Sequence, residues 1–576
     1  KLLTQWSVLG WVTEIDLSRV PPCDGKHVKS LWSSWLCQQV LDDISKCNWD
    51  KLRSDMLHRQ KFGTAGLRGR MGAGYKCMND VVILQTAQGL CSYLRKVCNQ
   101  AQLHNGIVVG FDGRYNSKRF AELTAKVFIS SSIPVHMFTE VCPTPLVSFG
   151  TILYHAAAGV MVTASHNPKE DNGYKVYWGN GTQIITPHDD NVLDEILQCL
   201  DIPDEHWNIE GIRSHSLVKN CQEEVTSKYM EYIHETLHSE NLELNKSVGI
   251  DTIYSAMHGV GYDYIMKAFE VANLKAPISV KQQQNPDPDF STVKFPNPEE
   301  AECLQLSKRL AEERGVRLVL VNDPDADRLA VADTKTWKVF TGNEMGALLG
   351  WWVLRQNEVK GDASDVYMLA SVVSSKMLRA IIKGKGEFVE TLTGFKWMGN
   401  VALLLKQQGK LPLFAFEEAI GYMCNAGVPD KDGVSAAVAS LATKLYSENS
   451  SLVAHLDKLY LEYGYHLTYN AYYICHDPAI IQKIFRRIRN YDGPSQTDTR
   501  SGFAPVGDFP GKFGKSPDVA AGDTRAWKPS DARSCSRGLL LPPKALLHDR
   551  ELEPNPGFAD IFAPGLKIKI KIYTCV

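Results

Sequence analysis

Several features that mark membrane proteins and small secreted proteins are missing from this sequence. The most apolar stretch, Met345–Leu354, is followed by Arg355 and is far shorter than the roughly 20 residues that cross a bilayer. We therefore expect a buried helix there and no membrane partner. The 14 cysteines form no C-x-x-C pair, and a chain this long needs no disulfides to hold a core together. The first residues show no signal-peptide pattern, so the protein is expected in the cytoplasm with reduced thiols.

A surplus of charge of one sign is also lacking. Lysine and arginine number 63 and aspartate and glutamate 65, which gives a net charge of −2. No overall cationic field attracts nucleic acid or acidic lipid, so neither is expected as a partner. Hydrophobic residues make up 44% and charged residues 22% of the sequence, which excludes wholesale disorder, a collagen-like chain and a coiled-coil rod. At roughly 150 residues per domain, this length predicts about four globular domains.

Common catalytic signatures are absent as well. Gly511–Ser516 has only two residues between its glycines, whereas the phosphate-binding loop of many nucleotide enzymes needs four. No predicted strand is followed by the G-x-G-x-x-G turn of dinucleotide-binding domains. Neither the H-E-x-x-H pattern of zinc proteases nor the G-x-S-x-G pattern of serine hydrolases occurs. These absences exclude the most familiar nucleotide-binding, zinc-protease and serine-hydrolase sites.

What the sequence does contain is a repeated pattern of short apolar runs that stop at polar loops. Helical stretches such as Ala301–Arg314 and Gly433–Glu448 alternate with these runs, and residues 30–60 also show helical apolar spacing. The alternation predicts α/β domains with parallel strands, whose ligands bind beyond the carboxyl ends of the strands. Four runs end in this way: Ile107–Phe111, Gly159–Thr163, Val316–Val321 and Leu413–Phe416.

The third of these runs leads into a cluster of aspartates, Asp323-Pro-Asp-Ala-Asp-Arg328. Three carboxylates at alternate positions directly after a strand suit a hard cation. A calcium loop of the EF-hand type requires Gly at its sixth position and Glu at its twelfth, but Arg328 and Thr334 stand there. Mg²⁺, which completes its shell with phosphate or water, is therefore predicted. The alternative is an acidic turn in which Asp and Pro are only turn formers.

A hydroxyl and an imidazole follow the second run, in Thr163-Ala-Ser-His-Asn-Pro168. Ser165 is a candidate nucleophile or phosphate carrier, although Ser-His-Asn-Pro on its own is more often a turn or helix cap. Lys175 is a candidate general acid or base, because a lysine held near a dication can lose its proton at neutral pH. The alternative for Lys175 is an ordinary exposed lysine.

Three further motifs carry weaker signals. Phe62–Arg68 has two glycines that permit close backbone approach and an arginine whose fork suits phosphate. The Glu417-Glu418 pair could accept hydrogen bonds from sugar hydroxyls or form a solvated face. Thr393–Trp397 could supply a cation and a stacking ring, although its tryptophan suits a core position equally. None of the three predicts a function alone.

Taken together and in this order, the motifs resemble those of the α-D-phosphohexomutase superfamily. The loop sequences are most similar to those of the eukaryotic phosphoglucomutase-2 branch of phosphopentomutases. The similarity is clearest in Gly173-Tyr-Lys-Val-Tyr-Trp178 and Phe416-Glu-Glu-Ala-Ile-Gly-Tyr-Met423. The resemblance covers roughly residues 35–492. It implies a multidomain α/β fold with three related α/β domains around a cleft, plus a smaller C-terminal α+β domain that is incomplete or divergent here.

The resemblance also implies domain boundaries and a mode of action. The expected parts are an N-terminal helical segment (1–60), a phosphoserine domain (61–240), a metal-binding domain (241–345), a sugar-binding domain (346–465) and the divergent C-terminal domain (466–576). The implied reaction converts 1-phosphates of ribose, deoxyribose or glucose into 5- or 6-phosphates through a sugar bisphosphate, which also serves as activator. A monomer is favoured.

Individual residues receive roles from the same resemblance. Phosphorylated Ser165 would hold one Mg²⁺ ion per chain together with Asp323, Asp325 and Asp327. The other expected site residues fall into a catalytic group, which comprises Ser165, Lys175, Arg68 and His166, and a substrate-binding group, which comprises Arg68, Lys396, Glu417 and Arg328.

The C-terminal region departs from the family pattern. The fourth domain of the family carries an Arg-x-Ser-Gly-Thr-Glu-Pro type loop that grips the phosphate that is not being transferred, whereas this sequence has Arg500-Ser-Gly-Phe-Ala-Pro505. Ten of the 27 prolines fall after Asn490, so residues 493–560 are expected to be mostly irregular. Two alternatives to a mutase therefore stay open: a glucose-1,6-bisphosphate synthase, and an inactive isoform.

Overall fold

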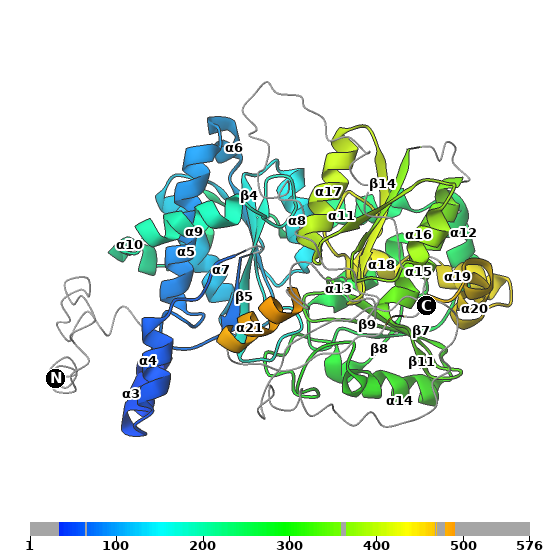
Figure 1. Cartoon of the computed structure of the whole chain (residues 1–576), viewed down its shortest axis with the longest axis horizontal. Helices are drawn as coiled ribbons and strands as arrows, with labels where there is room; N and C mark the ends of the chain where they lie inside the picture. Colours follow the sequence, from blue (N-terminus) through cyan, green and yellow to red (C-terminus); the bar gives the residue numbers. More distant parts are fainter. Residues whose placement is uncertain are drawn as a thin grey trace. The chain divides into compact units, whose positions relative to one another are not determined.

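Three separate β-sheets with flanking helices make up the first of two units of the chain (Figure 1). The structure is a computed structural model, which describes residues 34–63, 66–358, 365–439, 441–466, 468 and 478–489. The first unit is Lys1–Gly464 and the second is Tyr465–Val576. The main described element of the second unit is helix α21, Pro478–Arg489. The segment 493–560 and the loop Arg500–Pro505 lie outside the described residues.

The first sheet has six strands in the order β1-β5-β4-β2-β3-β6, and β5 runs antiparallel to both of its neighbours. Its central strands consist of consecutive buried apolar residues, because helices cover both faces. Val108 packs with residues of α8 and α11, whereas Val109 packs with residues of α5 and α7. The strands are β1 Gly66–Arg70, β2 Ile107–Phe111, β3 Val135–Met137, β4 Ala158–Val162, β5 Asp171–Trp178 and β6 Val218–Asn220.

The second and third sheets are smaller. The second has the order β11-β10-β9-β7-β8, and its parallel pair β7 and β9 continues into an antiparallel hairpin from β9 to β10. The third has the order β13-β12-β14-β15, with β12 parallel to β13 and β14. The strands are β7 Thr252–Ser255, β8 Ile278–Ser279, β9 Leu318–Asn322, β10 Leu329–Asp333, β11 Lys338–Val339, β12 Val366–Ser371, β13 Glu387–Thr391, β14 Leu411–Glu417 and β15 Gly421–Met423.

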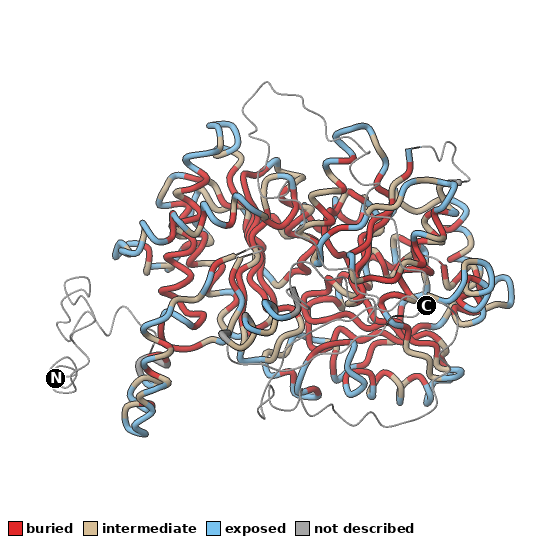
Figure 2. The backbone as a smooth tube through the Cα atoms, in the orientation of Figure 1, coloured by how far each residue is buried: buried red, intermediate tan, exposed pale blue. Residues whose placement is uncertain are grey.

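Helices surround the sheets, the strands are largely buried, and the exposed residues lie on the outer faces of the helices and in the loops (Figure 2). The helices are α3 Ser34–Ser45, α4 Trp49–Leu57, α5 Asp80–Val97, α6 Gln100–Asn105, α7 Ser117–Ser130, α8 Thr144–Leu153, α9 His188–Gln198, α10 Asp204–Trp207, α11 Gln222–Thr236, α12 Ser239–Val248, α13 Gly261–Val271, α14 Gln305–Arg314, α15 Gly342–Glu358, α16 Met377–Ile382, α17 Phe395–Gln407, α18 Gly433–Ala437, α19 Leu441–Ser447 and α20 Leu452–Tyr463. Short 3₁₀ turns occupy Ile212–Ser214, Lys281–Gln283 and Ala301–Leu304.

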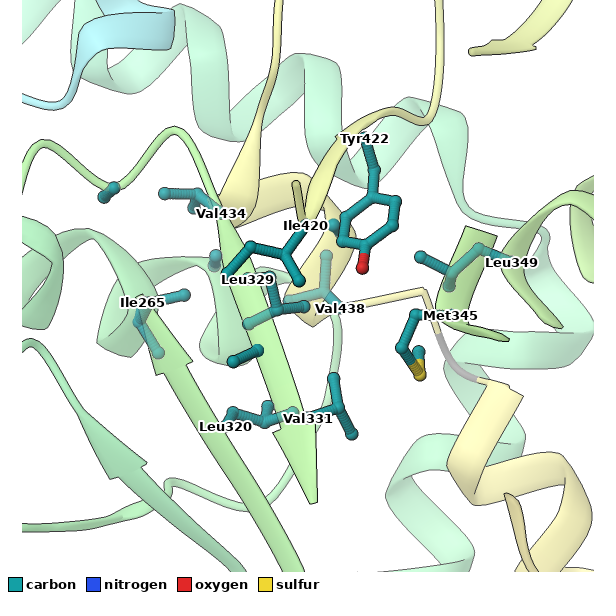
Figure 3. Close-up of a cluster of buried hydrophobic side chains, with 14 of the residues drawn as sticks. Ile265, Leu320, Leu329, Val331, Met345, Leu349, Ile420, Tyr422, Val434 and Val438 are labelled. Carbon is teal, nitrogen blue, oxygen red and sulfur yellow. The ribbon is translucent and has the colours of Figure 1, made fainter. Parts of the chain in front are cut away.

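One hydrophobic core joins the second and third sheets. Leu329 and Val331 of β10 face Ile420 and Tyr422, which lie at the start of β15, and Met345 of α15 closes the cluster (Figure 3). The backbone continues the connection, because Leu329 N–H donates to Ile420 O at 3.1 Å. Side chains that follow β9 and β14 are therefore fixed relative to each other.

The α/β multidomain class predicted from the sequence is confirmed. All four predicted strands are present, as β2, β4, β9 and β14. The apolar stretch Met345–Leu354 lies in the largely buried helix α15, and no helix among the described residues is long and apolar enough to cross a membrane. The helical stretch predicted over Gly433–Glu448 consists of two helices: after Ala437 the Val438 N–H donates to Ser435 O in a tight turn, which ends α18 before α19 begins.

Candidate active site

Ser165 lies on a strained turn directly beyond the carboxyl end of β4. Its backbone φ is 53°, in the left-handed region that costs a serine about 1–3 kcal/mol. The Ser165 N–H donates to Thr163 Oγ1 at 2.8 Å, which supports this conformation. The residue is only 2% exposed. The turn therefore presents a single hydroxyl at a fixed position, which is what a covalent carrier of phosphate needs.

Arg114, in the loop after β2, binds the backbone of the Ser165 turn. Its guanidinium donates to four backbone carbonyl oxygens of residues 165–171, at 2.5 Å (Ser165), 2.6 Å (Asn167), 2.8 Å (Pro168) and 3.2 Å (Asp171). The arginine is itself buried, and its Nε lies 3.2 Å from Asp112 Oδ2. The sequence analysis gave Arg114 no role. Carbonyl oxygens have no sequence signature, so only the structure identifies this contact.

We predict that Arg114→Lys lowers turnover about tenfold or more, because a single ammonium cannot bind four carbonyl oxygens at once. The melting temperature should fall as well, since buried carbonyls lose their donors. The matched control is Arg119→Lys, because the Arg119 side chain is 39% exposed and pairs with Asp80 away from this turn. Equal turnover in the two variants would show that the turn keeps its geometry without Arg114.

The three aspartates predicted to bind a cation lie together beyond the carboxyl end of β9. Asp323, Asp325 and Asp327 are at most 1% exposed, and each offers a carboxylate oxygen within 4.8 Å of the others. Asp325 Oδ1 and Asp327 Oδ1 are buried and have no hydrogen-bond donor. Buried carboxylate oxygens without donors are costly, and hard divalent cations prefer such ligands. The donor set therefore fits Mg²⁺, and the acidic-turn alternative does not explain it.

The pKa of the three aspartates is shifted in different directions. Burial and the neighbouring carboxylates of Asp325 and Asp327 raise the pKa of Asp323 well above its ordinary value. Burial also raises the pKa of Asp325 and Asp327. Lys175 and Thr144 together lower the pKa of Asp325 on balance, and Lys175, Lys431 and Arg328 together lower that of Asp327. Asp325 also accepts a hydrogen bond from Thr144 Oγ1 at 2.5 Å.

Ser165 and the aspartates, which come from different sheets, meet at one point. The Ser165 hydroxyl donates to Asp323 Oδ2 at 2.8 Å, and His166 Nδ1 lies 3.2 Å from the same hydroxyl. Lys175, in β5, donates to Asp325 Oδ2 at 2.7 Å and to Asp327 Oδ2 at 2.9 Å. The site thus brings together a hydroxyl group, three carboxylates that could hold a metal ion, and a lysine.

The pKa of Lys175 reflects the carboxylates around it. Burial lowers its pKa, but Asp325 and Asp327 outweigh burial and the net pKa is raised. These carboxylates favour the charged form of Lys175, and its role as general acid or base stays a prediction. Burial, followed by the charges of Arg328 and Arg68, lowers the pKa of His166 well below its ordinary value, so its imidazole is neutral.

Arg68 and Arg328 bring further positive charge to the same point. The pairing of β1 with β5 places Arg68 opposite Gly173, and its guanidinium donates to Ala164 O and Asn167 Oδ1 of the Ser165 turn. Arg328 donates to Ala419 O at 2.9 Å, and its Nη2 lies 3.7 Å from Glu417 Oε1. Guanidinium groups suit phosphate oxygens, and the phosphate-binding role expected of both arginines stays a prediction.

The acidic pair of the third sheet is buried, which excludes a solvated face. Glu417 is 7% and Glu418 4% exposed. Glu418 accepts a hydrogen bond from Ser371 at 3.1 Å, so it supports its own loop, whereas Glu417 faces Arg328. Lys396 is in the first turn of α17, where burial lowers its pKa against the opposing effect of Asp189. In the same helix, Asn400 Nδ2 donates to Gln183 O at 3.2 Å, so α17 contacts the loop that follows β5.

Lys431 completes the site and was not found by sequence reasoning. Its Nζ lies 3.4 Å from Asp327 Oδ2 and 3.6 Å from Asp430 Oδ1, and its side chain is 9% exposed. Burial lowers the pKa of Lys431, but Asp327 and Asp430 outweigh burial and raise it. Asp-Lys-Asp is an ordinary surface sequence, so no pattern in it predicts a buried ammonium.

Comparison with known proteins gives consistent matches over the first unit. The phosphoglucomutase/phosphomannomutase alpha/beta/alpha domains I, II and III match residues 59–200, 227–336 and 341–463. A human phosphopentomutase is 48% identical over 467 residues, which is 78% of this chain and 76% of the relative. A human glucose 1,6-bisphosphate synthase is 45% identical over 487 residues, covering 81% and 78%.

A solved structure shows the same fold. The crystal structure of a putative phosphomannomutase from Thermus thermophilus superposes with a TM-score of 0.59 at 21% identity, covering 72% of this chain and 86% of the other.

Proposed function

This chain belongs to the α-D-phosphohexomutase superfamily, in its phosphoglucomutase-2 branch, and from that premise we propose that it is a sugar-phosphate mutase. It interconverts 1-phosphates of ribose, deoxyribose or glucose with the corresponding 5- or 6-phosphates through phosphorylated Ser165 and a bisphosphate intermediate. The observation that carries the proposal is the hydrogen bond from Ser165 Oγ to Asp323, which joins a rigid hydroxyl to a buried cation site.

The residues of the chain divide the reaction among them. In the first half, the bond from phosphorus to Ser165 Oγ breaks as a sugar hydroxyl oxygen bonds to phosphorus. The bisphosphate then reorients in the site, and its other phosphoryl group is transferred to Ser165. Arg68 and Arg328 bind the oxygens of the phosphoryl group. Glu417 and Lys396 bind the sugar phosphate. Lys175, supported by the neutral His166, transfers the proton between the sugar hydroxyl and Ser165.

A cation fits the same scheme. Asp323, Asp325 and Asp327, with the phosphate on Ser165, would hold one Mg²⁺ per chain. When bound, the ion supplies positive charge that stabilises the transferring phosphoryl group. A sugar bisphosphate acts as activator, because it restores the phosphoryl group of Ser165 whenever this is lost.

A glucose 1,6-bisphosphate synthase is the second candidate, favoured by the 45% identity to such an enzyme. It uses the same loops but takes its phosphoryl group from 1,3-bisphosphoglycerate. An inactive isoform is a weaker candidate, because Ser165, Lys175 and the three aspartates are all in contact.

Activity assays separate these candidates. The purified full chain with Mg²⁺ and a trace of glucose 1,6-bisphosphate is given ribose 1-phosphate or glucose 1-phosphate, and products are followed by phosphorus NMR. We expect conversion to the 5- or 6-phosphate. Bisphosphate formation only when 1,3-bisphosphoglycerate is added would favour the synthase, and absence of any transfer would favour the inactive isoform.

The divergent C-terminal region predicts weak binding of sugar phosphates. Loss of charge-assisted hydrogen bonds worth about 1.5–3 kcal/mol each should cost at least tenfold in affinity. A chimera in which residues 493–576 are replaced by a family-type fourth domain should therefore have a kcat/KM for sugar monophosphates raised about tenfold or more. If the natural chain already matches the chimera, then its own C-terminal region binds the second phosphate.

Further expectations stay predictions. They are a cytoplasmic location, a monomeric state, and sugar phosphates as partners in place of nucleic acid or membrane.

A further inference from the structure

The segment Asp430–Asp432, between β15 and α18, carries a buried lysine toward the aspartate cluster of another sheet. The stem of Lys431 runs past Gly421, where an added Cβ would lie 2.4 Å from Lys431 Cδ. Its ammonium lies 5.4 Å from the centre of the Phe395 ring. The absent side chain at Gly421 and the aromatic face give the lysine one path through the interior, so its end is directed at Asp327.

Asp430 is fixed by residues of the first sheet and its following loop. The Tyr177 hydroxyl, from β5, donates to Asp430 Oδ2 at 2.8 Å, and Gln183 Nε2 donates to the same oxygen at 2.9 Å. The other oxygen, Oδ1, accepts the Lys431 backbone N–H at 2.8 Å. Tyr177 is fully buried and Asp430 is 1% exposed, so water does not replace these donors.

Asp432 is fixed on the other side of the lysine. The Tyr229 hydroxyl, from α11, lies 2.7 Å from both carboxylate oxygens of Asp432. Asp432 Oδ1 also accepts the N–H groups of Val434 at 3.1 Å and Ser435 at 3.0 Å, which caps α18. The two residues that flank Lys431 are therefore held by separate elements, while Lys431 itself contacts the second sheet.

From this arrangement we infer that Asp430 and Asp432 are positioning residues, which hold the Lys431 ammonium beside Asp327 and so set the affinity of the cation site. The contact of Tyr177 in the first sheet with Asp430 beyond the third sheet thereby influences cation affinity at the aspartates of the second sheet. The inference rests on the cation site of the proposed function. A fixed positive charge this close to a ligand carboxylate weakens the binding of a divalent cation, which keeps the ion exchangeable.

Asp327 and Asp430 both attract the Lys431 ammonium, and the hydrogen bond from Tyr177 weakens the attraction by Asp430. The ammonium lies almost equally far from Asp327 (3.4 Å) and Asp430 (3.6 Å). Hydrogen bonds from Tyr177 and Gln183 offset part of the negative charge of Asp430. Without the Tyr177 hydroxyl, Asp430 would attract the ammonium more strongly and draw it away from Asp327.

The test measures binding of Mn²⁺, as a probe for the site, to the full unphosphorylated chain by electron paramagnetic resonance. Tyr177→Phe should bind Mn²⁺ about threefold more tightly than the wild type, and Tyr229→Phe should change in the same direction. Lys431→Met, which removes the charge, sets the upper limit at about tenfold. The matched control is Tyr174→Phe, because Tyr174 is also fully buried in β5 but belongs to the hydrophobic core on the other face of the sheet.

The outcomes are distinct. A variant that is merely less well folded would bind Mn²⁺ more weakly, so tighter binding in Tyr177→Phe with unchanged binding in Tyr174→Phe supports the inference. Unchanged affinity in Tyr177→Phe and Tyr229→Phe, while Lys431→Met binds more tightly, would overturn the positioning role. Unchanged affinity in Lys431→Met would overturn the effect of its charge. Failure of the wild type to bind Mn²⁺ would instead overturn the cation site of the proposed function.

Discussion

Replacement of Ser165 by alanine should lower mutase turnover about a thousandfold or more, because the covalent carrier of the phosphoryl group is lost. The contacts of Asp323 Oδ2 and His166 Nδ1 converge on this one hydroxyl. Intact-mass analysis after incubation with a sugar bisphosphate should show a phosphoryl group on the wild type and none on Ser165→Ala.

The control for this variant is Ser307→Ala, which removes another buried serine hydroxyl, in α14, away from the site. Both variants should melt within a few degrees of the wild type, since each loses only one oxygen. Normal turnover by Ser165→Ala would contradict the covalent mechanism, and a phosphoryl group retained by this variant would place the carrier elsewhere.

The second large effect is expected from Asp325→Asn. Even a residue that only orients a metal ligand can change affinity or activity about 10–100-fold, so loss of a direct ligand should slow turnover about a hundredfold. The variant should bind Mg²⁺ more weakly, and added Mg²⁺ should restore part of its activity. Removal of the cation from the wild type with EDTA should give a similar loss. Calorimetric titration with Mg²⁺ and steady-state rates measure the two parts separately.

Asp333→Asn is the matched control, because Asp333 in β10 is also buried and pairs with Arg317 at 2.9 Å, away from the cluster. Loss of a paired carboxylate there should lower the melting temperature without changing Mg²⁺ affinity. If Asp325→Asn and EDTA both leave turnover unchanged, the three aspartates do not serve a catalytic cation.

Site residues whose type and spacing indicate a chemical role could be predicted from the sequence. The aspartates at alternate positions and the serine after an apolar run were expected beyond strand ends, and the structure places both there. Their contact across two sheets followed from the family resemblance and not from either motif. The assignment of roles to Arg68, His166, Lys396, Glu417 and Arg328 stays a prediction, as do the expected domain boundaries.

Residues whose partners are backbone atoms or distant side chains could not be predicted. Arg114 acts on carbonyl oxygens, which every residue has, so its motif carries no information about the contact. Lys431 lies near Asp327 in a segment whose flanking residues, Asp430 and Asp432, are bound by Tyr177 and Tyr229 from distant parts of the sequence. The end of α18 was also missed, since the apolar spacing of Gly433–Glu448 continues through the turn.

The central claim is that Ser165 passes its phosphoryl group to a sugar phosphate. The most direct measurement uses the full chain labelled at Ser165 with radioactive phosphate from a bisphosphate, freed of excess donor, and mixed with unlabelled ribose 5-phosphate and Mg²⁺ in a single turnover. The account predicts that the label leaves Ser165 and appears in ribose bisphosphate and then in ribose monophosphate. Label that stays on the protein, or is released only as inorganic phosphate, would contradict it.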